Sequence, residues 1–128
     1  YEPLFVEECS NLQRPVCAHP DMSVTIIDNK IFVSSDIAHM FGDEEKVVCN
    51  REERLHKYPD DIMFNCAIIG KKVLCKKSNT HKTIIEYLEQ NNYSIIDVNQ
   101  GYAKCSICIV SDEAIITSDK NIQIAQNR

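Results

Sequence analysis

Two short motifs place carboxylates and an imidazole just ahead of apolar, strand-like runs. The first is His19-Pro20-Asp21, and the second, Tyr58-Pro59-Asp60-Asp61, begins 39 residues after His19. A carboxylate in such a loop could hold a cationic guanidinium group through paired hydrogen bonds. The imidazole of His19 could move protons near neutral pH. These residue types predict Asp21, Asp60 and Asp61 as binding residues and His19 as a catalytic acid or base. The alternative is that both motifs are simple turns, because Pro fixes φ and Asp bonds its own backbone.

A third segment, Gly101-Tyr102-Ala103-Lys104-Cys105, precedes another apolar run. Cys105 follows Lys104, and a nearby cation lowers the pKa of a thiol, so we expect Cys105 to be a reactive thiolate. Tyr102 and Lys104, together with Asn65 after the second motif, complete the expected binding residues. The alternative for Gly101-Tyr102 is a turn and a packing wedge over the core.

The spacing Cys105-x-x-Cys108 also occurs in zinc sites and redox motifs. In an extended strand, residues three apart point to opposite faces, which suits neither chemistry. No second cysteine pair or nearby histidine completes a four-ligand site. We therefore expect no metal and no cofactor, and we expect ordinary packing for Cys108.

Three stretches of the chain resemble one another. They read Ile26-Ile27-Asp28-Asn29-Lys30-Ile31-Phe32-Val33, Ile68-Ile69-Gly70-Lys71-Lys72-Val73-Leu74-Cys75 and Ile109-Val110-Ser111-Asp112-Glu113-Ala114-Ile115-Ile116, and they start 42 and 41 residues apart. A period in the forties indicates one supersecondary unit per copy, as in solenoids and propellers. The predicted units cover about 19–57, 58–100 and 101–128 of a single domain, each with the order strand, strand, helix, strand.

The third predicted unit stops before its last strand. An open end of a repeat fold exposes unpaired strand edges and apolar surface. We therefore expect residues 1–128 to be part of a larger domain, or a homo-oligomer to cover the open edges.

Composition restricts the partners. The chain has 44% hydrophobic and 26% charged residues, which is typical of a globular domain, and a net charge of −5. This balance offers no basic footprint, so we expect no nucleic acid partner. No apolar run reaches the roughly 18 residues of a membrane span, so we expect no membrane partner. Seven cysteines without an export signal indicate a reducing cytoplasm.

The repeated unit resembles the α/β-propeller of the guanidine-modifying enzymes, which include arginine deiminases, dimethylarginine hydrolases, agmatine deiminases and amidinotransferases. More closely, the three motifs, with Ile115-Ile116-Thr117-Ser118-Asp119, resemble an uncharacterised clostridial family assigned to that pentein-like fold. The resemblance covers residues 19–128 and implies an α+β partial propeller with about three of five blades present. The Phe-x-Arg-Asp and Glu-Gly-Gly/Asp patterns of the deiminases are absent, and their late nucleophilic cysteine would lie outside this chain.

This resemblance implies a protein that binds, or hydrolyses, a small cationic guanidino or amidino compound. Asp21 with Asp60 or Asp61 would hold the cation, and His19 would serve as acid or base. The alternative is a non-catalytic interaction module on the same scaffold, which an apolar or aromatic surface patch in place of a polar pocket would indicate.

Overall fold

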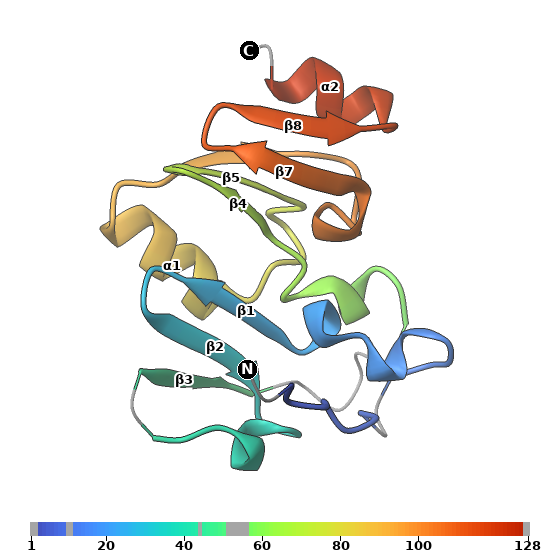
Figure 1. Ribbon diagram of the computed structural model, residues 1–128, viewed down its shortest axis with the longest axis vertical. Coiled ribbons are helices and arrows are strands. Elements are labelled where there is room, and N and C mark those ends of the chain that lie inside the picture. The colour runs from blue at the N-terminus through green and yellow to red at the C-terminus, as the bar shows by residue number, and fades with distance from the viewer. Residues whose placement is uncertain (1–2, 10–11, 44, 51–56, 127–128) are drawn as a thin grey trace.

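The computed structural model describes residues 3–9, 12–43, 45–50 and 57–126, which form three small β-sheets and two α-helices (Figure 1). The first sheet contains β1 (Val24–Ile27), β2 (Lys30–Ser34) and β3 (Lys46–Cys49). The second contains β4 (Ala67–Ile69), β5 (Lys72–Cys75) and β6 (Ser94–Asp97). The third contains β7 (Ile107–Ser111) and β8 (Ala114–Thr117). Helix α1 (Lys82–Gln90) precedes β6, and α2 (Lys120–Gln126) follows β8.

The first two sheets share one topology. In each, two strands form an antiparallel hairpin, and the third strand pairs in parallel with the second strand of that hairpin. The pairs Ile27–Lys30 and Ile69–Lys72 close two-residue turns. In the first turn Asp28 adopts the left-handed conformation, with φ 53°, which Asp tolerates better than most residues. The repeat seen in the sequence is therefore a repeat of hairpins.

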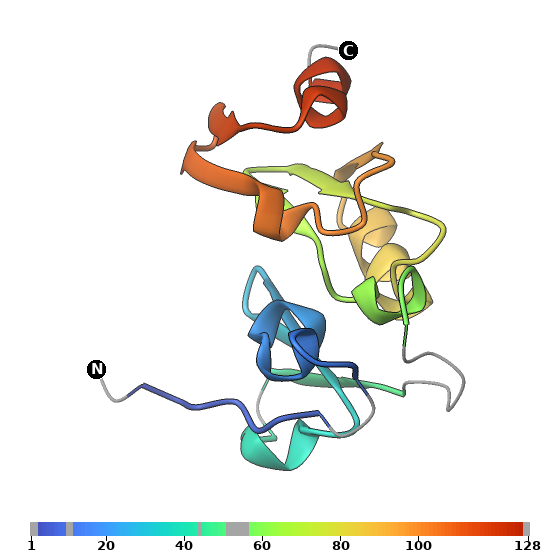
Figure 2. The ribbon, with the colours of Figure 1, turned by 90° about the vertical axis from the view of Figure 1, so that its right-hand side faces the viewer.

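The predicted propeller is wrong. In both views the sheets follow one another along the longest axis, with the first sheet at one end and the third at the other (Figures 1 and 2). Within the described ranges the sheets do not close into a ring, and what remains of the prediction is a mixed α+β chain. The physical reason is that the sequence period reports strand pairing inside a unit. The rotation between units depends on side chains at the interfaces, which the period does not describe.

Apolar side chains fill the space between successive sheets. One buried cluster joins Ile27 and Phe32 of the first sheet to Phe64 and Val73 of the second unit. A second cluster joins residues of the second sheet, such as Leu74, to the third unit and to α2. The apolar face of α1 packs into the first cluster. Ile84 and Leu88, which are four residues apart and so lie on one face of the helix, are fully buried there. The first two sheets therefore contribute buried residues to these clusters, whereas the third sheet contributes only partly buried ones, Ile107 and Ile115.

The first unit lacks the predicted α-helix. The segment around Met40 forms only one turn of 3-10 helix, η3 (Ala38–Met40), which has no side-chain cap. The Asp36 carboxylate, just before this turn, accepts hydrogen bonds from the Ser34 hydroxyl at 3.0 Å and the Cys9 thiol at 3.1 Å. The predicted boundary between the first two units falls near 51–56, which lie outside the described residues.

No helix in the described part of the chain has the length and apolar character needed to cross a membrane.

A polar clamp at the β1–β2 turn joins the first sheet to the second. The Asp28 carboxylate accepts hydrogen bonds from the hydroxyls of Tyr93 at 2.7 Å and Tyr87 at 3.1 Å. The Lys71 ammonium lies 3.7 Å from the same carboxylate and 4.0 Å from the centre of the Tyr93 ring. The hydrogen bond from Tyr93 is the main reason why the pKa of Asp28 is lowered. Burial, with Asp28 beside it, raises the pKa of Tyr93 to about 12.

This clamp predicts an acid-sensitive contribution to stability. A carboxylate whose pKa is lowered by folding stabilises the folded state above its unfolded-state pKa, and the contribution is lost as the pH falls through the folded-state pKa. Asp28→Asn keeps a residue that accepts the left-handed turn but removes the charge, so we expect a lower Tm at pH 7. The Tm difference from the natural chain should shrink as the pH falls below about 5. Thermal unfolding followed by circular dichroism measures this, and Asp112→Asn, at an exposed turn position, is the matched control. A Tm difference that is constant with pH would contradict the clamp.

Candidate functional site

A short 3-10 turn precedes each of the three hairpins. These turns are η2 (Pro20–Met22), η4 (Asp60–Ile62) and η5 (Lys104–Ser106). Each contains residues that the sequence singled out. Because the turns occupy equivalent places ahead of stacked hairpins, the stacking brings parts of them together, although the sheets do not surround a common axis.

Asn65 connects all three loops. Its side chain is buried, and its amide nitrogen donates hydrogen bonds to Asp21 Oδ2 at 2.8 Å and to Cys105 Sγ at 3.2 Å. Its amide oxygen accepts a hydrogen bond from the backbone N–H of Lys104 at 2.7 Å. Donor and acceptor ends are both used, so the orientation of the amide is determined. Asn65 therefore holds residues from the first and third units in place.

The Asp21 carboxylate lies at the centre of this cluster. The Cys105 thiol donates a hydrogen bond to Asp21 Oδ2, and His19 Nδ1 lies 3.9 Å from Oδ1. The Asp21 side chain is 18% exposed and that of His19 is 56% exposed. An acid, a thiol and an imidazole are thus side by side, with the carboxylate between the other two.

These groups line an open cavity of about 440 Å³. Its walls are His19, Pro20, Asp21, Lys104 and Cys105. Asn65 lies behind the wall and is hydrogen-bonded to three of these residues, Asp21, Lys104 and Cys105. The structure therefore brings together five of the residues singled out in the sequence: His19, Asp21, Asn65, Lys104 and Cys105.

Three other residues singled out in the sequence lie apart from this cavity. Asp61 is buried, and its Oδ2 accepts a hydrogen bond from the Tyr102 hydroxyl at 3.0 Å. Burial, followed by that hydrogen bond, raises the pKa of Tyr102 to about 12. Asp60 Oδ1 accepts a hydrogen bond from the Asn79 amide at 3.5 Å. None of the three lines the cavity around Asp21.

Gly101 allows the loop that carries Tyr102 to pack closely against Tyr58 and Ile62. A Cβ at Gly101 would collide with the Tyr58 ring and with Ile62. The rings of Tyr58 and Tyr102 stack with their centres 5.6 Å apart. The loop before β7 therefore fits closely on the loop before β4.

The expected reactive thiolate at Cys105 is not what the surroundings favour. Cys105 is exposed, but partial desolvation of its thiol, followed by the hydrogen bond to Asp21, raises its pKa, so the neutral thiol dominates near pH 7. The sequence placed the Lys104 charge beside the sulfur, but the fold places the Asp21 carboxylate there. Cys105 also lies in η5 rather than in a strand, and Cys108 is exposed on β7 rather than packed in the core.

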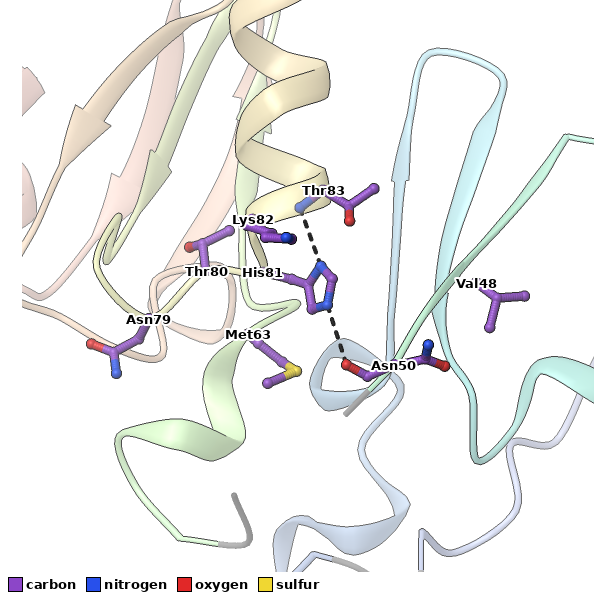
Figure 3. Close-up of a pocket in the computed structure, with 8 residues that line it drawn as sticks. All are labelled: Val48, Asn50, Met63, Asn79, Thr80, His81, Lys82 and Thr83. Atoms are coloured by element: carbon purple, nitrogen blue, oxygen red, sulfur yellow. Dashed lines mark hydrogen bonds between the residues drawn. The ribbon is translucent and has the colours of Figure 1, made fainter. Parts of the chain in front are cut away.

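Another cavity, of about 500 Å³, lies at the start of α1 (Figure 3). His81 caps this helix: its Nδ1 accepts a hydrogen bond from the Thr83 N–H at 3.2 Å, and its Nε2 lies 3.3 Å from the Asn50 carbonyl oxygen. Both ring nitrogens are thereby used in holding the helix start, which gives His81 a structural role.

The hydrogen bonds of Asn65 predict that removing its amide lowers the free energy of unfolding. Asn65→Leu keeps a similar volume but removes the acceptor of the Lys104 N–H and one of the donors to the Asp21 carboxylate. Unpaired buried polar groups cost about 1–3 kcal/mol, so we expect the free energy of unfolding to fall by that amount. Urea denaturation measures it. Asn99→Leu, at an exposed position, should change it by less than about 0.5 kcal/mol; equal effects of the two changes would contradict the bridging role.

The thiol–carboxylate contact predicts the reactivity of Cys105. Asp21→Asn removes the negative charge that disfavours the thiolate, so iodoacetamide should alkylate Cys105 roughly three- to tenfold faster at pH 8. Peptide mass mapping follows each thiol separately, and exposed Cys108 is the internal control. An unchanged or lower rate at Cys105 would show that the carboxylate does not govern this thiol.

Comparison with known proteins leaves the resemblance to the guanidine-modifying enzymes and to a clostridial family as a prediction. No curated protein and no solved structure matches the chain. The model of a family of unknown function, DUF6873, matches residues 1–128. Because the match spans the whole sequence, the chain belongs to this family of unknown function.

Proposed function

We propose that the cavity around Asp21 binds a small cationic guanidino or amidino compound. The observation that carries the proposal is a partly exposed carboxylate whose second oxygen is held by Asn65 and Cys105, at the wall of an open cavity. A guanidinium N–H can donate a charge-assisted hydrogen bond to Oδ1, the oxygen that Asn65 and Cys105 do not use. The Asp21 charge that disfavours a thiolate at Cys105 also attracts a cation.

Binding is better supported than turnover. Hydrolysis or transfer of an amidino group would require a nucleophile beside the bound carbon, and Cys105 is the sulfur at hand. Its raised pKa keeps it as a thiol near neutral pH, so its nucleophilicity is low in the free protein. His19 is exposed and could exchange protons with solvent, but it reaches Cys105 only through Asp21. We therefore propose a binding function, and the enzyme alternative is tested by the release of ammonia or urea.

Lys104 makes the proposal sharply testable, because it contributes the opposite charge to the same cavity. Arginine, agmatine and methylarginines should bind, and isothermal titration calorimetry measures their affinity. Asp21→Asn should weaken binding about 10- to 100-fold, since a hydrogen bond to a charged group is worth about 1.5–3 kcal/mol. Lys104→Gln should strengthen it, because a repulsive charge is removed while the backbone N–H bond to Asn65 remains.

The matched control for this test is Asp112→Asn, which removes an exposed charge elsewhere and should leave the affinity unchanged. Failure of the whole panel to bind would contradict the proposal. The opposite pattern, with Asp21→Asn improving and Lys104→Gln weakening the binding of small carboxylates, would show that the cavity accepts anions.

A second candidate function is that of an interaction module. Val110 and Ile116 in the third sheet are 61% and 65% exposed, and apolar residues that gather on a surface mark contacts with partners. A homo-oligomer that covers this sheet is the corresponding proposal. Light scattering coupled to size-exclusion chromatography would show a mass above 14.7 kDa, and Ile116→Ser should return it to one chain. A cytoplasmic location also belongs to the proposal and is supported by seven cysteines with no disulfide among them in the structure.

A further inference from the structure

An apolar groove of about 380 Å³ adjoins the cavity around Asp21. The first strand of each hairpin contributes to it, with Ile26 from β1, Ile68 from β4 and Ile109 from β7. These isoleucines occupy the same position of the sequence repeat, at intervals of 42 and 41 residues. The stacking of the sheets thus turns one repeated sequence position into one continuous apolar surface.

The fold buries only part of this surface, since Ile68 packs partly against the first cluster. Ile26 is 61% exposed and Ile109 is 48% exposed, whereas the next residue in the first repeat, Ile27, is fully buried. Exposed isoleucines gain nothing from the core, and each would gain from an apolar group placed against it. The neighbouring cavity around Asp21 indicates which kind of ligand would cover the groove.

The groove and the cavity are adjacent. Pro20 and Lys104 line both of them, so a ligand can extend from one into the other without leaving the surface. One end of this combined surface offers the Asp21 carboxylate, and the other offers aliphatic side chains. A ligand complementary to both ends carries a cationic head and an unbranched apolar tail.

We infer that the groove binds the apolar tail of an alkyl-substituted guanidine whose cationic head lies at Asp21. The inference rests on the proposed function and names its ligand class more closely. The tail replaces water over Ile26, Ile68 and Ile109, and the head keeps its hydrogen bonds to the carboxylate. Unsubstituted guanidine uses only the polar half of the site and therefore binds weakly.

A chain-length series tests this inference. Methyl-, n-butyl- and n-hexylguanidine are titrated calorimetrically below their aggregation concentrations, with alkanols of the same chain lengths as tail-only probes. Each methylene group that is buried should tighten binding by about two- to fourfold. The heat-capacity change of binding should become more negative with chain length, which is the robust marker of apolar burial.

Two neighbouring residues provide matched variants. Ile109→Ser removes a groove wall and should flatten the dependence on chain length, while the affinity of methylguanidine stays the same. Val110→Ser changes the next residue, which is also exposed but does not line the groove, and should preserve the dependence. Asp21→Asn should weaken every guanidine by the same factor and leave the dependence intact. Circular dichroism confirms that each variant is folded.

The outcomes distinguish failure of the tail site from failure of the proposed function. An affinity that does not change with chain length, while methylguanidine still binds, would overturn the tail site and leave the proposed function standing. Equal weakening by Ile109→Ser and Val110→Ser would also overturn it. Alkanols that bind as tightly as the matching guanidines would show that the head contributes nothing, which overturns the proposed function. Steep dependence for guanidines, lost only in Ile109→Ser, supports both.

Discussion

The buried amide of Asn65 is the interaction on which the candidate site depends. It donates to Asp21 and Cys105 and accepts from the backbone of Lys104, so one side chain links residues that are 44 and 40 positions away. An amide can do this because it has donors at one end and an acceptor at the other. With an apolar residue in its place, the loop before β4 would lose its hydrogen bonds to the other two loops, which would be joined here by the Cys105–Asp21 hydrogen bond.

That amide is in position because the sheets are stacked. Phe32 from the first sheet and Phe64 from the loop before the second sheet share one buried cluster. The Asp28 carboxylate also joins the two sheets, because it accepts hydrogen bonds from Tyr87 and Tyr93. These contacts set the offset between hairpins, and the offset sets where the three preceding turns meet. The apolar groove has the same origin, since equivalent strands follow one another along the molecule.

The charge of Asp21 decides which chemistry the cluster favours. A carboxylate beside a thiol holds the proton on sulfur, so Cys105 is a hydrogen-bond donor before it is a nucleophile. The same charge attracts a cation, which would in turn lower the pKa of the thiol. The positive charge of Lys104 in the same cavity weakens this attraction for a cation.

The sequence by itself determined the hairpins, because alternation of apolar residues around short polar turns specifies strand pairing over a few residues. It also determined that His19, Asp21 and Cys105 lie ahead of strands, and their residue types indicated chemistry. Only the tertiary structure decided that the sheets form a row instead of a ring, that Asp21 rather than Lys104 governs Cys105, and that Asp61 pairs with Tyr102 away from the cavity. These outcomes depend on contacts between residues about 40 or more positions apart, and local pattern carries no information about such contacts.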